Sequence, residues 1–427
     1  MARMDSGPYP IHDTRLPNGL RVIVSPDHQA PAVAVNLWYD VGSRHEEPGR
    51  TGFAHLFEHL MFQGSANVGS GQHIALMQAA GASVNATTWF DRTNYFQALP
   101  TGGLELALWL EADRMGTLLE AVGQDNLDNQ RDVVKEEKRQ RYDNVPYGDV
   151  MERLVGLTFP PDHPYGHTTI GSMADLDNAS LDYVHHFFRA HYVPNNCVLT
   201  LVGDVTAKHG VELAQRYFGH LAAGELPPPP PASDLGPITG LPRAHVQAVV
   251  PADAAYFTWR LPPLGTRAID AVDLALFIIG GSQTSRFHRS LVRGAELATS
   301  AGASALQLIG GHSLGFASAR ARDGVDLAAL EEAMVAQIDR FLTDGPTPEE
   351  VQRSHAQFER SWLQSLARLD TRADQISGAA TLLDDPQRIN TRIDTVSSIS
   401  GDEVRDAARQ HLSPDHRATL LYRQETP

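Results

Sequence analysis

The chain has 427 residues, of which 42% are hydrophobic and 20% are charged. This balance is typical of a globular protein and excludes wholesale disorder and fibrous repeats. Lys and Arg number 35 and Asp and Glu number 51, so the net charge is −16, which disfavours nucleic acid as a partner because phosphate binding requires clustered positive charge. No apolar stretch is long enough to predict a membrane span, and no secretion signal is visible, so we expect a soluble protein of the cytoplasm or the periplasm.

The first half of the chain alternates strand and helix patterns. Runs of β-branched and apolar residues between turn signals predict strands over 20–24, 32–39, 95–99 and 197–202. The last of these contains Cys197, the single cysteine, which we interpret as a buried apolar residue. Apolar residues at three- and four-residue spacing predict helices over 51–63, 73–80 and 104–119. We expect His73 to lie on the exposed face of its helix.

Five consecutive prolines, Pro227–Pro231, mark a linker, because successive prolines hold an extended and semi-rigid conformation. The linker predicts an N-terminal domain over 1–223, a connecting segment over 224–239 and a C-terminal domain over 240–427. The second half repeats the order of the first, which indicates an internal duplication. Its predicted strands are 246–250 and 255–261, and its predicted helices are 270–279, 327–342 and 349–368.

One helical segment carries residue types suited to metal-dependent hydrolysis. In the sequence His55-Leu-Phe-Glu-His59, the two histidines are four residues apart and therefore share one face of a helix. A hydrolytic zinc site needs two or three such ligands, an open position for water, and a carboxylate that is not a ligand. Glu58 lies beside the two histidines and supplies that carboxylate.

A third ligand must come from elsewhere in the chain, and a later helix offers two candidates. Glu136 and Glu137 are neighbours in the segment 130–140. Glu137 shares a helical face with Gln130 and Val134, whereas Glu136 is rotated by about 100° toward the charged side. We therefore predict Glu137 as the ligand and expect Glu136 to be solvated.

The pattern of His55, Glu58 and His59, followed by a helix glutamate, resembles the inverted zinc motif of the pitrilysin and insulysin family, the inverzincins, which include the mitochondrial processing peptidases. The resemblance spans nearly the whole chain. Further segments that look like family landmarks are 16–20, 49–53, 61–65, 85–88, 91–95, 142–148 and 163–167.

The resemblance implies a site, a cofactor and a fold. By motif match, His55, His59 and Glu137 are zinc ligands, with one Zn²⁺ per chain, and Glu58 is the general base. The implied fold is α+β, with two homologous domains that each have a mixed sheet with helices on one side and together form one half of a clamshell. The implied activity is that of a zinc metalloendopeptidase acting on peptides or unfolded segments inside a closed chamber.

In this family the peptide substrate is thought to lie along an edge strand near the zinc. The segment Ala82, Ser83, Val84, Asn85 and Ala86 occupies that place in the sequence. Backbone pairing with an edge strand binds extended peptides with little demand on their side chains. We therefore predict these residues to bind substrate.

The chain departs from the family at its second functional pair, an arginine and a tyrosine seven residues apart in the half that faces the zinc domain. Arg293 matches the arginine, but Ser300 stands where the tyrosine is expected. A serine is too short to replace a phenol that stabilises the developing oxyanion. We therefore expect a heterodimer in which a homologous subunit carries the Arg/Tyr pair, and a homodimer is the alternative.

Two other functions stay open at this point. The first is a processing peptidase that removes basic presequences, which the net charge of −16 would favour. The second is a structural subunit that keeps the fold without catalysis. The presence of His55, Glu58, His59 and Glu137 together argues against the structural subunit.

Overall fold

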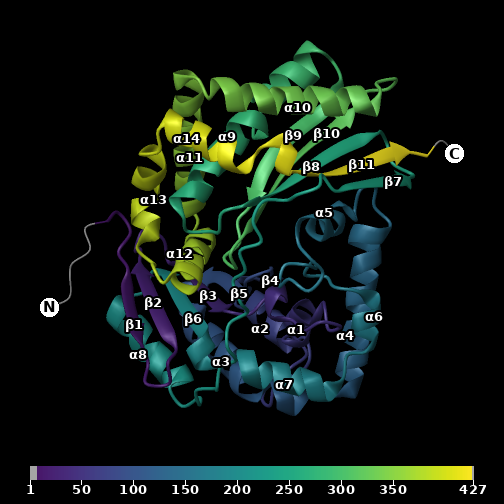
Figure 1. Ribbon diagram of the computed structural model, residues 1–427. Coiled ribbons are helices and arrows are strands. Elements are labelled where there is room, and N and C mark those ends of the chain that lie inside the picture. Colours follow the sequence, from purple (N-terminus) through teal and green to yellow (C-terminus); the bar gives the residue numbers. More distant parts are fainter. Residues whose placement is uncertain (1–6, 426–427) are drawn as a thin grey trace. The chain divides into compact units, whose positions relative to one another are not determined.

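The computed structural model describes residues 7–425, which form two compact units that each combine several stretches of the chain (Figure 1). Unit 1 contains the chain up to Lys138, Thr168–Pro230 and Trp362–Arg392. Unit 2 contains Arg139–His167, Pro231–Ser361 and the chain from Ile393 onward. Within residues 7–425, none of the helices combines the length and the apolarity that crossing a bilayer requires.

Unit 1 is built on a six-stranded mixed sheet with the strand order β1-β2-β6-β3-β5-β4. Strands β2 and β6 are parallel, and the other neighbours are antiparallel. Strand β4 lies at one edge of this sheet. The strands are β1 (His12–Arg15), β2 (Arg21–Pro26), β3 (Ala32–Tyr39), β4 (Ser83–Thr88), β5 (Thr93–Pro100) and β6 (Cys197–Gly203).

Helices cover both faces of the unit 1 sheet. On one face, α12 (Leu369–Leu383) packs against β3 and β6, where its Ile376 shares an apolar core with Trp38. On the other face, α8 (Ala207–Phe218) approaches the sheet closely at Gly210, next to Leu201. The remaining helices of this unit are α1 (Phe53–Leu60), α2 (Gln72–Ala79), α3 (Leu104–Ala121), α4 (Gln124–Lys138), α6 (Met173–Asp177) and α7 (Leu181–His191).

Unit 2 is built on a five-stranded sheet with the strand order β7-β11-β8-β10-β9. The first pair is parallel and the others are antiparallel. The strands are β7 (Arg243–Ala248), β8 (Ala254–Leu261), β9 (Ala298–Leu306), β10 (Ser313–Ala321) and β11 (Ala418–Gln424). The helices include α5 (Val150–Thr158), α9 (Arg267–Gly280), α10 (Leu327–Asp344) and α14 (Gly401–His411), while α11 (Pro348–Leu366) and α13 (Arg388–Ser397) continue across the unit boundaries.

The two sheets repeat one topology. Taken in chain order, β2 to β6 of unit 1 and β7 to β11 of unit 2 follow the same spatial order and the same parallel and antiparallel pairings. Strand β9 is therefore the counterpart of the edge strand β4. The mixed α/β fold with two related domains, as predicted from the sequence, is confirmed, but in unit 1 helices cover both faces of the sheet and not one.

Each half of the chain contributes one helix to the compact unit formed mainly by the other half. Helix α12, which follows the proline-rich segment, packs on β3 and β6 of unit 1, and helix α5, which precedes it, packs on β8 and β11 of unit 2. These strand pairs are equivalent in the repeated topology, so the exchange is reciprocal. The compact units therefore differ from the continuous stretches 1–223 and 240–427 that the linker predicts, and α12 gives the unit 1 sheet a second covered face.

Candidate metal centre

Helix α1, which carries the two histidines of the motif, is held at its N-terminus by a buried carboxylate. Gly52 precedes the helix with a φ of 90°, a left-handed conformation that favours glycine and provides no capping side chain. Glu46 instead accepts hydrogen bonds from the backbone N–H groups of Gly52 (2.9 Å) and Ala54 (2.7 Å). The first N–H groups of a helix have no intrahelical partner, so this carboxylate satisfies them and interacts favourably with the helix dipole.

The side of α1 that faces away from His55 and His59 packs against aromatic rings of α7 and of Tyr192, which directly follows α7. The ring centroids of Phe53 and Tyr183 are 4.7 Å apart, and those of Phe57 and Tyr192 are also 4.7 Å apart. Phe57 is fully buried. Because these rings fix the rotation of α1, the side chains of His55 and His59 are directed to the other side of the helix.

The structure brings His55, His59 and Glu137 together. Oε2 of Glu137 lies 3.8 Å from Nε2 of His55 and 3.4 Å from Nε2 of His59. One ligand atom from each of the three residues lies within 4.8 Å of the other two. In the part of the chain that the structure describes, no other group of three or more His, Cys, Asp or Glu side chains meets this condition.

This donor set fits a zinc ion. Two imidazole nitrogens and one carboxylate oxygen are ordinary zinc ligands, and tetrahedral bonds of about 2.0–2.1 Å place neighbouring ligand atoms about 3.3 Å apart. The distances from Glu137 to the two histidines are close to this spacing. The three side chains are between 14% and 22% exposed, so the group is partly accessible to solvent. Three protein ligands with an open fourth position are typical of catalytic rather than structural zinc sites.

Helix α4 presents Glu137 to this group and leaves Glu136 on its outer surface. Gln130 and Val134, which share the face of Glu137, are buried, whereas Glu136 is exposed. This arrangement agrees with the helical periodicity on which the choice between the two glutamates depended.

Glu58 lies on α1 between the two histidines and is held by a residue from the sheet. Its Oε2 accepts a hydrogen bond of 2.6 Å from Oγ1 of Thr88, the last residue of β4. Burial raises the pKa of Glu58, and the hydrogen bond from Thr88 and the nearby His59 and Arg92 lower it in part, which leaves the pKa above its ordinary value. A raised carboxyl pKa suits a group that accepts and then returns a proton near neutral pH.

The predicted substrate-binding residues lie at the edge of the unit 1 sheet. Ser83, Val84, Asn85 and Ala86 belong to the edge strand β4, and Ala82 precedes it directly. The side chains of Ser83 and Asn85 are exposed. Among the described strands, β4 pairs with β5 alone, and an edge strand is the element on which β-strand addition takes place.

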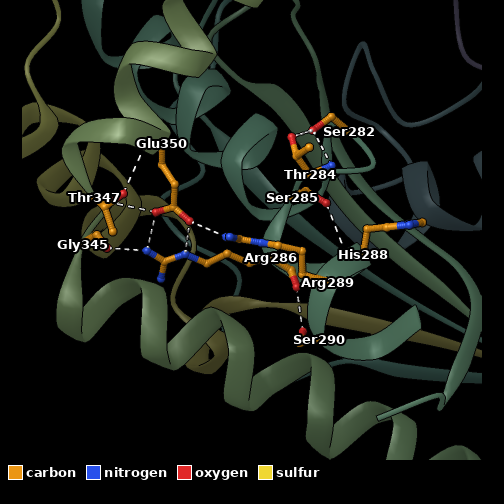
Figure 2. Close-up of polar contacts among 10 residues, drawn as sticks. All are labelled: Ser282, Thr284, Ser285, Arg286, His288, Arg289, Ser290, Gly345, Thr347 and Glu350. Atoms are coloured by element: carbon orange, nitrogen blue, oxygen red, sulfur yellow. Dashed lines mark hydrogen bonds and ion pairs between the residues drawn. The ribbon is translucent and has the colours of Figure 1, made fainter. Parts of the chain in front are cut away.

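Arg293, the remaining predicted site residue, is an exposed side chain of unit 2, in a π-helical turn over His288–Gly294. Ser300 lies on the edge strand β9. Arg286, just before this turn, and Arg289, within it, both bind the carboxylate of Glu350, as Figure 2 shows. These two arginines are therefore held inside unit 2 by an ion pair.

Comparison with known proteins identifies the family. The model for the insulinase peptidases, family M16, matches residues 21–171, and the model for the M16 inactive domain matches residues 178–358. A relative from Helicobacter pylori, the zinc protease PqqE, is 30% identical over 339 residues, which cover 78% of this chain and 75% of that protein. The chain belongs to the insulinase family of peptidases. The resemblance to the pitrilysin and insulysin family is thereby confirmed.

Solved structures agree with this assignment. The crystal structure of a protease from Helicobacter pylori matches with a TM-score of 0.89 and 25% identity, covering 97% of this chain and all of that one. A peptidase M16 inactive domain from Pseudomonas fluorescens matches with a TM-score of 0.87, 98% and 100% coverage, and 16% identity, and therefore shows likeness of fold alone. The inactive-domain model matches none of His55, Glu58, His59 or Glu137, which all lie within the insulinase segment.

Sequence reasoning missed some residues around this centre and misplaced another. The capping residue Glu46 gave no signal, because it lies six residues before Gly52 and reaches it only through the loop. Thr88 was noted only as part of a family landmark. The expectation that His73 is exposed was wrong: the residue is 4% exposed on α2, where its ring packs against Phe62 and approaches Glu111. Most of α2 is exposed, but His73 and Met77, four residues apart, lie on its one buried face, and the helix contacts β4 and α3.

Proposed function

We propose that this insulinase-family chain is a zinc-dependent endopeptidase and the catalytic subunit of a two-chain enzyme that hydrolyses peptides or unfolded segments in a closed chamber. The observation that carries the proposal is the convergence of His55, His59 and Glu137, with Glu58 beside them on the same helix. A structural subunit has no need for three metal ligands and a separate, partly buried carboxylate in one place.

Different residues of the chain have different roles in the proposed reaction. His55, His59 and Glu137 would hold the metal. Bound zinc supplies a Lewis acid that polarises the scissile carbonyl and makes a water molecule more acidic. Glu58 would take a proton from the attacking water and later donate it to the leaving amine.

The substrate would lie along β4. A peptide that pairs with Ser83–Ala86 through its backbone is held in an extended conformation next to α1, because Thr88 at the end of the same strand contacts Glu58. Backbone pairing makes few demands on side chains, so we expect broad specificity for extended, unfolded segments. The net charge of −16 favours basic peptides among them.

The partner in this proposal is a homologous subunit that supplies the Arg/Tyr pair. Ser300 of this chain lacks the reach of a tyrosine, and Arg286 and Arg289 are held by Glu350. An isolated chain would therefore lack one source of transition-state stabilisation, and removal of one such donor typically costs about 100- to 1,000-fold in kcat.

The test is cleavage of unfolded protein and of peptides with and without a basic segment, measured together with zinc content and oligomeric state. We expect one zinc per chain, inhibition by a chelator, and loss of cleavage in Glu58→Gln with zinc retained. Strong preference for basic presequences would indicate a processing peptidase. A zinc-free chain that cleaves nothing with or without a homologous partner would refute the proposal in favour of a structural subunit.

A further inference from the structure

The hydroxyl group of Thr88 connects the proposed general base to the proposed substrate-binding strand. Thr88 is the last residue of β4 and is 9% exposed. Its Oγ1 donates a hydrogen bond of 2.6 Å to Oε2 of Glu58. A hydrogen bond to a carboxylate is short and strong, and its direction restricts the rotation of the side chain that accepts it.

The position of this hydroxyl group is determined by the end of the β4–β5 hairpin. Thr88 pairs with Thr93 across the two strands, and the hairpin closes with a hydrogen bond of 2.8 Å from the Trp89 N–H to the Arg92 carbonyl. A threonine side chain has one strongly restricted torsion angle, so a fixed backbone here also fixes the direction of the hydroxyl group.

A neighbouring hydroxyl group does not compete for Glu58. The Thr93 hydroxyl group lies 2.8 Å from the backbone carbonyl oxygen of Val41 and 3.5 Å from Oγ1 of Thr88, so its proton has acceptors other than Glu58. Thr88 is therefore the hydroxyl donor to Glu58 at this position. The bond engages only Oε2, which leaves Oε1 of Glu58 for the proton transfer that the reaction requires.

We propose that Thr88 is a positioning residue for Glu58 and that it couples peptide pairing on β4 to the orientation of this base. The inference rests on the proposed function. A peptide that adds to β4 also stabilises the strand whose last residue holds Glu58, so the carboxylate is aligned best when substrate is bound. Alignment of this kind affects the chemical step more than the initial binding of substrate.

The test compares Thr88→Val, which keeps the shape of the side chain but removes the hydroxyl group, with Thr88→Ser, which keeps the hydroxyl group. Thr200→Val is the matched control. Thr200 is a fully buried threonine of the unit 1 sheet, and its Oγ1 accepts a hydrogen bond of 2.8 Å from Ser377 of α12. The measurements are kcat, KM, zinc content and thermal stability of the full chain with its partner.

We expect Thr88→Val to lower kcat by about 10- to 100-fold, the usual effect of losing a partner that orients a group at a metal site. KM should change by less than about twofold, zinc content should stay that of the wild type, and Thr88→Ser should recover most of the loss. Thr200→Val should keep its kcat.

Three results would overturn the inference: a Thr88→Val enzyme with the kcat of the wild type, a Thr88→Ser enzyme as slow as Thr88→Val, or an equal loss in Thr200→Val. These results leave the proposed function standing as long as the wild type cleaves and Glu58→Gln does not. A zinc-loaded wild type that cleaves nothing would instead refute the proposed function, and this inference with it.

Discussion

Arg286 and Glu350 form a two-point ion pair across 64 residues of sequence. The Nε and Nη2 atoms of Arg286 contact the two carboxylate oxygens of Glu350 at 3.1 and 2.7 Å. The side chain of Glu350 is 5% exposed and that of Arg286 is 12% exposed. Glu350 also accepts hydrogen bonds from the Thr347 N–H and from Arg289, so most of its bonding capacity is used inside unit 2 (Figure 2).

We expect Glu350→Ala to lower the free energy of unfolding by about 3–5 kcal/mol, because it leaves the buried guanidinium of Arg286 without its counter-charge. Arg289→Ala is the matched comparison. Its side chain is 54% exposed and binds the same carboxylate, so its loss should cost at most about 1 kcal/mol. Urea denaturation measures the free energy of unfolding of both variants. Equal losses would show that the pair of Arg286 and Glu350 stabilises the protein no more than the exposed pair does.

The zinc ligands can be tested without an activity assay. Glu137→Gln should weaken zinc binding by more than about 100-fold, because replacing an orienting partner of a ligand already costs 10- to 100-fold. Glu136→Gln, on the exposed neighbour of the same helix, should bind zinc as the wild type does. Competition with a chromophoric chelator gives both affinities. Weaker zinc binding in Glu136→Gln alone would show that Glu136, and not Glu137, is the ligand.

Because His73 is buried, we expect the folded protein to lose stability in mild acid. Burial and the charge of Arg114 lower the pKa of His73 from 6.5 to about 2. Below pH 6.5 the unfolded chain therefore takes up a proton that the folded chain refuses down to about pH 2, so stability falls as the pH falls through this window. The contribution of one such group approaches about 1.4 kcal/mol per pH unit.

The variant His73→Gln should reduce the dependence of unfolding free energy on pH below 6.5 by one proton. The measurement is a series of urea titrations between pH 5 and neutral pH, and the slope rather than the absolute stability is compared. An unchanged slope in His73→Gln would show that folding does not lower the pKa of His73.

Alanine substitutions at two helical glycines of unit 2 should change the stability of the protein in opposite directions. At Gly280, the end of α9, an added Cβ would lie 2.3 Å from the backbone nitrogen of Ala303. At Gly156, inside α5 and exposed, an added Cβ would meet nothing within 4 Å. Gly280→Ala should destabilise the protein by about 1–3 kcal/mol through overpacking. Gly156→Ala should stabilise it by about 0.5–1 kcal/mol, since glycine is costly inside a helix. Thermal unfolding of the two variants distinguishes these effects, and a stabilised Gly280→Ala would contradict the close approach of α9 to β9.

The sequence by itself determined the features that depend on local periodicity. A spacing of four residues places His55 and His59 on one helical face in any helix, and the same geometry separates Glu137 from Glu136. The similar succession of strands followed by helices at the start of the two halves was visible for the same reason. Strands poor in bulky residues, such as β9 with its run of Ala, Ser and Gly, gave no such pattern and were not predicted.

Only the tertiary structure decided which distant segments meet. The exchange of α5 and α12 between the two units, the burial of His73 and the contact of Thr88 with Glu58 all depend on how separate segments pack. Periodicity shows which face of an element is apolar, but many surfaces of similar chemistry can cover that face. The choice among them is made by the shape and the register of the whole assembled core, which no single segment encodes.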